Sequence, residues 1–407
     1  MNIALVAQGY PSDKGRGGIG SQTYAKANSL ATLGHRVFVI SRSSENKREE
    51  LIKENVHIYL IPGLEQQLPE MTEAVQWLTH SFVIAAEIQS LLQKYQLDII
   101  EFPEWGAEGY TYLLNRTDWN KIPVVIQLHG PMVMLANKIH WPHINSVFYK
   151  VGTHMEAICC QQADAVYSSS QCSAEWVSQH YHVTKKNIPV IHTGVDTNAF
   201  APHTFAKAEK PTIVFTGRLV QNKGAEELVD AAIDLSKEIN GLQLRLLGDG
   251  EEGFINKLKA KAQKANATAL LHFLGFVRKE DLPGELSKAH VFAAPSYYEG
   301  GPGFVYLEAM ACGLPVIGCS GSGVEEIITD EVNGILVQPR SVEELKVALR
   351  KILLNPELAN QLGKAARDFT VSHADNTACI LKLESFYKSV IEKYNPGHVI
   401  ENLLVPS

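Results

Sequence analysis

Cysteine, long apolar runs and leader-like segments are all scarce in this 407-residue sequence. Its six cysteines show neither CxxC spacing nor the density of a disulfide framework, so we expect reduced, largely buried thiols and a cytoplasmic location. No stretch approaches the roughly 20 apolar residues that a membrane span requires, and strand-like residues follow Met1 without a basic leader. These absences disfavour secretion and membrane spanning, and they leave peripheral contact with a membrane open.

Positive charge is scarce as well. Residues 1–200 hold 15 Lys/Arg against 18 Asp/Glu, the remainder holds 22 against 26, and the net charge is −7. Since neither half is basic, the sequence argues against nucleic acid as a partner and against strong docking on anionic membranes. A small molecule is the expected partner, and the oligomeric state stays open.

Short apolar runs alternate with longer amphipathic stretches in two blocks, and this pattern is typical of parallel sheets covered by helices. Strands are expected at 3–7, 37–40, 56–60, 98–102, 124–128, 165–167 and 189–192, and then at 212–216, 242–247, 270–273, 291–294, 316–318 and 335–337. The spacing also predicts a helix over 82–95 with a core-facing stripe that includes Phe82 and Ile84. The fold class is therefore α/β, with two Rossmann-like, doubly wound domains facing a central cleft.

A chain of this length exceeds what one core usually organises, so two domains are expected. The proline-containing segment 200–210 is the best linker. We expect an N-terminal domain over 1–200 and a C-terminal domain over 201–374. A helical segment over 375–407 could pack anywhere, including back on the first domain.

A glycine-rich loop follows the first expected strand. Residues 15–20 read GRGGIG and lead into a helix that begins near Ser21. Glycines let a backbone approach an anion closely, and a helix start offers free N–H groups. The spacing fits neither GxGxxG nor a Walker loop, so a phosphate cradle and a structural turn are equally supported.

Two further motifs stand at strand ends in the second block. The first carries Arg218 and Lys223 in GRLVQNKG, and together these cations could hold a diphosphate or could be surface residues of a solvated turn. The second runs from Glu299 through a glycine-rich turn to Glu308 inside a helix. Backbone N–H groups there could bind sugar or phosphate, whereas Glu308 alone could equally be a salt-bridge partner.

Taken in order, these motifs resemble glycosyltransferase family four, a large retaining family that includes sucrose synthases and bacterial polysaccharide enzymes. The resemblance extends over the Gly17–Gly18 loop, HTGVDTNAF at 192–200, GRLVQNKG at 217–224 and the segment 299–317, and it continues through GVEEIITDEVNGILV at 323–337. It implies the GT-B fold and transfer of a hexose from a nucleotide-sugar. It also implies that the domain over 1–200 binds the acceptor and that the domain over 201–374 binds the donor.

The resemblance also implies roles for matching positions. The implied catalytic residues are His129, Arg218, Lys223 and Glu299. Donor binding would involve Gly17, Gly18, Arg218, Lys223, Phe276, Val277, Glu299, Gly301, Gly303, Phe304, Val305 and Glu308. Glu299 would bind sugar hydroxyls, Glu308 the ribose and Val277 the base. His129 matches the family's active-site histidine, although a capping role is an alternative.

One departure concerns the two glutamates. The family usually places seven residues between them and this chain has eight, so the shape of the turn around Glu299 is in question. On the acceptor side, Glu101 and Glu104 follow a strand end and could face an acceptor or lie at the surface. The basic residues Lys138, Lys150 and His154, with nearby histidines, could form an anion site if the acceptor is a sugar phosphate.

Chemistry at a diphosphate leaving group requires charge stabilisation, which the two cations and the glycine-loop amides could supply. No Asp-x-Asp pair is present, so we expect no metal site and no cofactor other than the substrate nucleotide-sugar. UDP-glucose is the first expected donor, and the acceptor could be a sugar, a sugar phosphate as in sucrose-phosphate synthases, or a glycan. A nucleotide-sugar epimerase and a non-catalytic nucleotide-sugar-binding protein are the alternatives.

Overall fold

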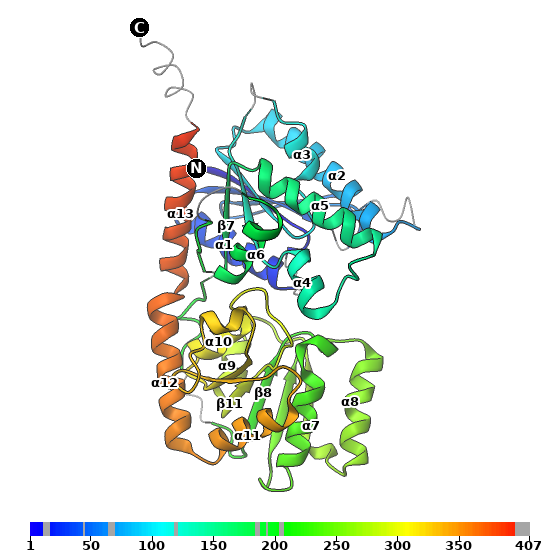
Figure 1. Cartoon of the computed structure of the whole chain (residues 1–407). Helices are drawn as coiled ribbons and strands as arrows, with labels where there is room; N and C mark the ends of the chain where they lie inside the picture. The colour runs from blue at the N-terminus through cyan, green and yellow to red at the C-terminus, as the bar shows by residue number, and fades with distance from the viewer. Residues whose placement is uncertain are drawn as a thin grey trace. The chain divides into compact units, whose positions relative to one another are not determined.

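The computed structural model describes residues 1–10, 17–43, 45–63, 70–117, 121–183, 188–192, 194–202 and 207–394. Contacts divide the chain into two compact units, one formed by Met1–His192 with Cys379–Ser407 and the other by Thr193–Ala378. In Figure 1 the first unit runs from blue to green and takes in the red helix α13, whereas the second runs from green to orange. Each unit is built on a sheet of its own, which confirms the predicted α/β class.

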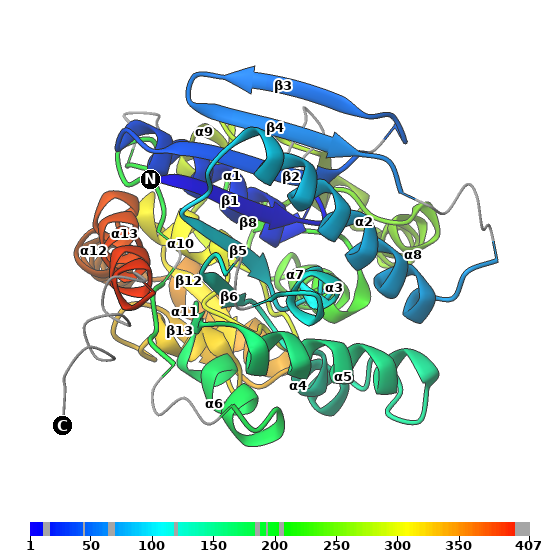
Figure 2. The same ribbon diagram turned by 90° about the horizontal axis from the view of Figure 1, so that it is seen from above.

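The sheet of the first unit has seven strands in the order β3-β4-β2-β1-β5-β6-β7. Its strands are β1 (Asn2–Ala7), β2 (Arg36–Arg42), β3 (Glu49–Lys53), β4 (Val56–Ile61), β5 (Ile99–Pro103), β6 (Val124–Leu128) and β7 (Ala165–Ser168). All pairs are parallel except β3 with β4, and Figure 2 shows β3 outside β4 at the sheet margin. The carboxyl ends of the parallel strands therefore meet at one edge.

Helices cover both faces of this sheet. They are α1 (Gly17–Thr32), α2 (Glu73–Lys94), α3 (Tyr110–Leu114), α4 (Met132–Ile139), α5 (Val147–Gln162), α6 (Gln171–His180) and α13 (Asn376–Lys393). Alternate residues of β1 point to opposite faces: Ile3 and Leu5 pack in one apolar cluster with side chains of α1 and α13, whereas Ala4 and Val6 pack in another with side chains of α2 and α5. The final helix thus belongs to the core of the first unit.

Two sequence expectations in this unit need correction. The segment 189–192 is not a strand, because only Val190 forms an isolated bridge, with Ser168. Phe82 is not in the core: it is 66% exposed, while Ile84 and Ile88 of the same helix are buried. The sequence pattern also missed β3, because its Leu51 and Ile52 are exposed and give no buried periodicity.

The second unit holds a six-stranded parallel sheet in the order β10-β9-β8-β11-β12-β13. Its strands are β8 (Thr212–Thr216), β9 (Gln243–Leu247), β10 (Leu271–Gly275), β11 (Val291–Ala293), β12 (Val316–Cys319) and β13 (Ile335–Val337). All six were expected at these places from the sequence. One apolar cluster joins them to the surrounding helices.

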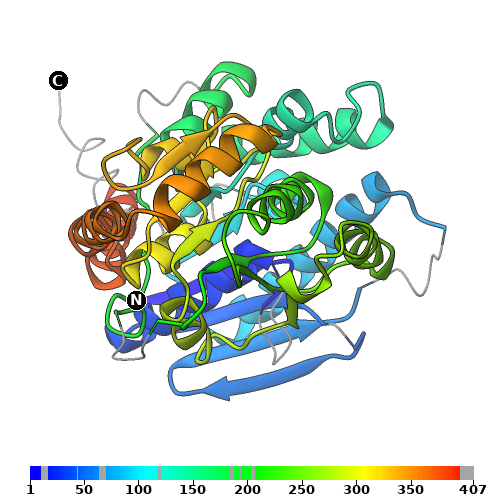
Figure 3. The same cartoon turned by 90° about the horizontal axis from the view of Figure 1, so that it is seen from below.

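The helices of this unit are α7 (Ala225–Leu235), α8 (Glu252–Lys264), α9 (Leu282–Ser287), α10 (Phe304–Ala311), α11 (Val342–Leu353) and α12 (Pro356–His373). Figure 3 shows α7 and α8 nearly end-on and side by side, in green and yellow-green. Lys261 of α8 pairs there with Asp230 of α7 at 2.6 Å. Among the residues that the structure describes, no helix combines the length and the apolar character needed to cross a membrane.

Candidate donor site and the segment around His129

The strand order of the second unit creates a switch point between β8 and β11. From β8 the chain moves outward to β9 on one side, whereas β11 begins the other side of the sheet. Ligands of open parallel sheets bind outside the carboxyl ends of the strands at such a point. Arg218 and Lys223 follow β8, and Glu299 follows β11, so the topology brings the predicted donor motifs to one edge.

Lys223 and Glu299 contact each other there, with 2.5 Å between Nζ and Oε1. Their loops are tied together by the backbone, because the amide of Tyr297 donates to the carbonyl of Asn222 at 2.9 Å. Gly224 has φ 71°, and a Cβ on it would lie 2.0 Å from the carbonyl oxygen of Pro295. Only glycine fits this approach, so the close packing of the two loops depends on it.

The longer turn after Glu299 is also fixed by its backbone. The Glu299 carbonyl accepts from the amide of Gly323 at 2.8 Å, and a Cβ on Gly323 would lie 2.6 Å from the carbonyl oxygen of Gly301. The turn ends at Gly303, the N-cap of α10, with φ 71°. Glycine has no side chain to cap the helix, and the Tyr306 amide donates to the Gly303 carbonyl at 3.1 Å. Within the described residues, the amides of Phe304 and Val305 are the N–H groups of this turn that an anion can use.

Glu308 is buried in α10, with 6% of the residue exposed. Burial raises the pKa of its carboxyl to about 7, and the positive charge of Lys279 opposes that rise. The Lys279 ammonium lies 5.5 Å from the ring centroid of Phe304 in the first turn of α10. Sequence reasoning did not single out Lys279; the available signal was a cation two residues beyond Val277.

The predicted base-binding residues follow β10. Phe276 is 46% exposed, and Val277 is partly buried against the core of the unit. The Gly275 carbonyl before them accepts from the amide of Gly248 at 2.8 Å, which ties this turn to the end of β9. Arg218 is exposed. The backbone on either side of it is fixed, because the amide of Gly217 donates to the carbonyl of Leu247 and the amide of Leu219 donates to the carbonyl of Asp249.

Residues 11–16, which include Gly15 and Arg16 of the first glycine-rich loop, lie outside the described residues. Helix α1 begins at Gly17, earlier than Ser21. A Cβ on Gly20 would lie 2.2 Å from the Gly9 carbonyl oxygen, whereas a Cβ on Gly18 would meet nothing within 4 Å. Gly20 therefore permits close packing of the helix against the end of β1, and Gly18 lies open.

His129 comes directly after β6 in the first unit. Burial, reinforced by the charge of Lys26, lowers the pKa of His129 to about 3, so the imidazole is neutral at physiological pH. Its Nδ1 is buried and has no hydrogen-bond partner among the described residues. The residue as a whole is partly exposed.

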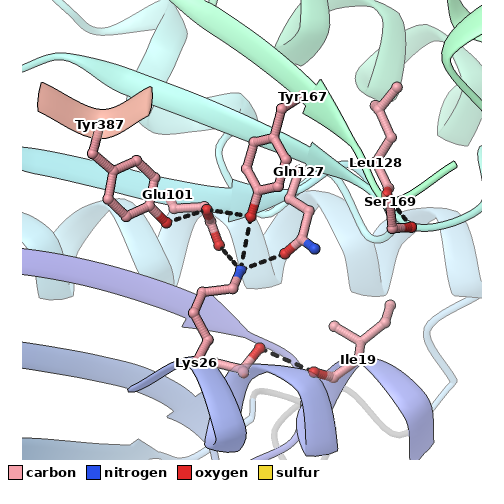
Figure 4. Close-up of polar contacts among 9 residues, drawn as sticks. Ile19, Lys26, Glu101, Gln127, Leu128, Tyr167, Ser169 and Tyr387 are labelled. Carbon is pink, nitrogen blue, oxygen red and sulfur yellow. Dashed lines mark hydrogen bonds and ion pairs between the residues drawn. The ribbon is translucent and has the colours of Figure 1, made fainter. Parts of the chain in front are cut away.

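Neither Glu101 nor Glu104 lies at the surface. Glu104 is fully buried, and its carboxylate accepts from the backbone amide of His129 at 2.6 and 2.8 Å. Glu101 is buried with Lys26 in a network that also contains Gln127, Tyr167 and Tyr387, as Figure 4 shows. The Tyr167 hydroxyl donates to Glu101 at 2.8 Å, and Tyr387 brings α13 to the same carboxylate.

The proposed acceptor-side cations lie on two helices. Lys138 is in the last turn of α4, and Lys150 and His154 are one turn apart on α5. All three are exposed, and the His154 ring lies 6.5 Å from that of Tyr110. Direct acceptor binding by these residues and by Glu104 stays a prediction.

Comparison with known proteins identifies the class. Over 96% of the chain, the structure superposes on 99% of a sucrose-phosphate synthase from Thermosynechococcus elongatus with a TM-score of 0.84 at 23% identity. It also matches HepE of Anabaena in complex with UDP-glucose, with a TM-score of 0.70 and 18% identity over 96% of this chain and all of that one. The fold is therefore GT-B.

The sequence comparisons reach the family. Residues 16–199 match the profile described as Glycosyltransferase Family 4, and residues 196–369 match that of Glycosyl transferases group 1. A GDP-mannose-dependent phosphatidylinositol monomannoside mannosyltransferase of Mycobacterium tuberculosis is 30% identical over 210 residues, which are 48% of this chain. That alignment spans 54% of the relative, about half its length. The chain belongs to glycosyltransferase family 4.

Proposed function

We propose that this protein is a retaining hexosyltransferase that moves a hexose from a nucleoside-diphosphate sugar to a hydroxyl of a sugar, sugar phosphate or glycan. The observation that carries the proposal is the Lys223–Glu299 pair at the carboxyl ends of β8 and β11, beside the glycine-capped start of α10. A cation and a carboxylate at this point of an open sheet suit a ligand with both phosphate and hydroxyl groups.

Negative charge develops on the diphosphate as the glycosidic bond breaks. Arg218 and Lys223 offset that charge, with the N–H groups of Phe304 and Val305 at the start of α10. In the free protein the Lys223 ammonium is paired with Glu299. Donor binding gives Lys223 a second anionic partner and leaves the Glu299 carboxylate to accept from sugar hydroxyls.

The rest of the donor is assigned to neighbouring groups. Glu308 accepts from ribose hydroxyls, Lys279 adds a cation beside it, and Phe276 with Val277 holds the base. Gly17, Gly18 and Gly301 contact the donor through their backbone. These assignments are supported by their positions next to strand ends, by the exposure of Phe276 and by the closeness of Lys279 to Phe304.

His129 is assigned to the transferred hexose. With a pKa near 3 it is neutral, so it exchanges hydrogen bonds with a sugar hydroxyl through Nε2 and does not act as a general acid near pH 7. The departing phosphate oxygen then takes the acceptor proton on the face it leaves, which retains the anomeric configuration. The protein's own cations supply the charge stabilisation that this route requires.

Two donors deserve the first trials. UDP-glucose is our first assignment, and the solved HepE complex contains it. GDP-mannose is the second, because the mycobacterial relative depends on it. ADP-glucose completes a screen of three bases against glucose, fructose 6-phosphate and an oligosaccharide as acceptors.

The screen uses donors labelled in the sugar, with products separated by chromatography. Transfer to an acceptor, with the anomeric configuration kept, supports the proposal. Isomerised donor would establish an epimerase instead, and saturable binding without turnover would establish a binding protein. Arg218→Ala and Lys223→Ala should each lower turnover by about 10²-fold or more, as loss of a transition-state contact does.

Lys237→Ala is the matched control for these two substitutions. Lys237 is a surface lysine of the same unit, paired with Asp234 and 68% exposed in its side chain. It should leave turnover unchanged. Full turnover in both Arg218→Ala and Lys223→Ala would remove the proposed diphosphate site.

A further inference from the structure

The segment from His129 to Val133 has every backbone N–H bound by a buried side chain. Glu104 accepts from the amides of His129 and Gly130. Pro131 has no N–H, Glu156 accepts from the amide of Met132 at 2.9 Å, and the Tyr181 oxygen accepts from Val133 at 3.4 Å. Tyr181 in turn donates its hydroxyl to Glu156.

The peptide that precedes His129 is also held on its carbonyl side. The Leu128 oxygen accepts from the Ser169 backbone amide at 3.3 Å and from its hydroxyl at 3.2 Å. Figure 4 shows the hydroxyl contact at the end of β6. One peptide group is thus fixed from both sides, by Ser169 on its oxygen and by Glu104 on its N–H.

Glu104 and Glu156 differ from the other buried carboxylates nearby. Glu101 pairs with Lys26, and Glu108 pairs with His80 at 3.1 Å. Within the described residues neither Glu104 nor Glu156 has a cationic partner, although both are 0% exposed. Burial disfavours the charged form of a carboxyl that has no cation beside it, and it raises the pKa of Glu104 to about 7 and the pKa of Glu156 well above its usual range. Two such buried groups behind one short segment indicate that the segment's conformation matters.

The same contacts exclude another use of this segment. The N-terminus of α4 would be a natural anion site, because its first N–H groups have no partners within the helix. Here Glu156 and Tyr181 already bind the amides of Met132 and Val133. A phosphate cannot take these donors without displacing a carboxylate, so the ring of His129 is what this segment offers to a substrate.

We propose that Glu104 is a positioning residue, which with Glu156 and Tyr181 behind it fixes the backbone of His129 so that the imidazole meets the transferred hexose. The inference rests on the role of His129 in the proposed function. In this proposal Glu104 acts through the His129 backbone, in place of the direct contact with the acceptor that the sequence predicted for it.

The test compares Glu104→Gln, Glu104→Asp and Glu108→Gln in the full-length protein, with UDP-glucose as the donor probe, or GDP-mannose if only that donor turns over. Gln keeps the shape of Glu104 and replaces one accepting oxygen with an NH2 group that faces backbone N–H groups. We expect Glu104→Gln to lower kcat at least tenfold with the donor KM within about twofold. Glu104→Asp, which keeps the carboxylate, should recover part of that loss.

Glu108→Gln is the matched control, because Glu108 is equally buried, lies four residues further on and contacts His80 instead of the His129 segment. It should leave kcat within about threefold. An equal loss of kcat in Glu104→Gln and Glu108→Gln would overturn the proposal, since general damage to the unit would then explain both. If Glu104→Gln does not fold, Tyr181→Phe removes the outer hydroxyl of the same cluster and should lower kcat without raising KM.

A spectroscopic measurement separates this proposal from the role of His129. In protein labelled with ¹⁵N-histidine, the ring signals of His129 are those lost in His129→Gln. Glu104→Gln should shift these signals and leave those of the other histidines in place; unchanged His129 signals would overturn the positioning role. Full activity of His129→Gln would instead refute the proposed role of His129, whatever Glu104→Gln does to the spectrum.

Discussion

The two units of the molecule differ in how deeply the polar groups near their strand ends are buried. In the first unit, Glu101 in the middle of β5 and Glu104 directly after it are buried and bound by other groups of the same unit. At the strand ends of the second unit, Lys223 and Glu299 are paired but partly exposed, with 27% and 17% of their side chains accessible. Arg218 beside them is exposed.

This difference separates groups that shape the protein from groups that can exchange partners. A buried, satisfied network rigidifies its surroundings and gains nothing from a ligand. A partly exposed ion pair contributes little to stability, so a diphosphate can compete for its cation at small cost. The buried carboxylates Glu101 and Glu104 of the first unit therefore have a structural task, whereas the partly exposed groups of the second unit suit the donor binding that we propose.

The largest expected effect tests whether the buried network around Glu101 stabilises the first unit. Glu101→Ala removes the partner of Lys26, whose pKa burial already lowers, and leaves that amine buried without its carboxylate. We expect a loss of about 3–5 kcal/mol from the free energy of unfolding of the first unit. All five tryptophans lie before residue 192, so tryptophan fluorescence in a urea titration follows this unit alone.

Glu50→Ala is the control, because the Arg48–Glu50 pair is about half exposed and its loss should cost less than ~1 kcal/mol. The double variant Lys26→Met with Glu101→Gln should recover part of the lost stability, since no unpaired charge then remains. Equal urea midpoints for Glu101→Ala and the wild type would show that the buried network does not stabilise the unit.

An intermediate effect concerns the pH dependence of donor binding in the second unit. Burial raises the pKa of Glu308 to about 7, so this carboxyl is ionised above that pH and protonated below it. Only the ionised form accepts from both ribose hydroxyls, hence affinity should fall as the pH drops from 8 to 5.5, by up to about tenfold per unit below the pKa. Calorimetric titration with UDP, GDP and ADP measures it.

Nucleoside diphosphates also titrate near pH 6, so Glu308→Gln is needed to isolate the protein's contribution. In this variant the affinity at pH 8 should be lower and the remaining pH dependence should be that of the phosphate alone. Wild type and Glu308→Gln with parallel pH profiles would show that Glu308 does not contact the nucleotide.

The same contrast explains which parts the sequence could predict. In the second unit the donor motifs stand at strand ends, so their order and the six strand positions were enough to predict that Lys223 and Glu299 share one edge. In the first unit the carboxylate of Glu104 accepts from the amides of His129 and Gly130, which are 25 and 26 residues away in the sequence. A pattern of residue types carries no record of such backbone contacts.

Phe82 and β3 were mispredicted because a sequence pattern does not show which residues tertiary packing buries. Phe82 fits the helical apolar period, yet it lies on the face of α2 that no element of the described chain buries, because periodicity gives a stripe and tertiary packing decides its width. The edge strand β3 pairs only with β4 and exposes Leu51 and Ile52, so its sequence lacks the buried alternation by which strands are found.

The smallest expected effect concerns Lys279, an exposed cation of the proposed donor site. Lys279 is exposed, its ammonium lies over the Phe304 ring, and its charge lowers the pKa of Glu308 against the effect of burial. Lys279→Met should weaken binding of UDP, GDP or ADP by about three- to fivefold, as expected for an exposed cation.

The charge of Lys279 also determines in which direction Lys279→Met shifts the pH dependence of nucleotide binding. Without Lys279 the pKa of Glu308 rises further, so the loss of nucleotide affinity on acidification should begin at a higher pH than in the wild type. Arg278→Met is the control, because Arg278 is 70% exposed in its side chain and pairs with Asp281 instead. If the pH at which nucleotide affinity falls moved equally in both variants, long-range charge would be what sets the pKa of Glu308. A shift confined to Lys279→Met would place this lysine among the groups that exchange partners when the donor binds.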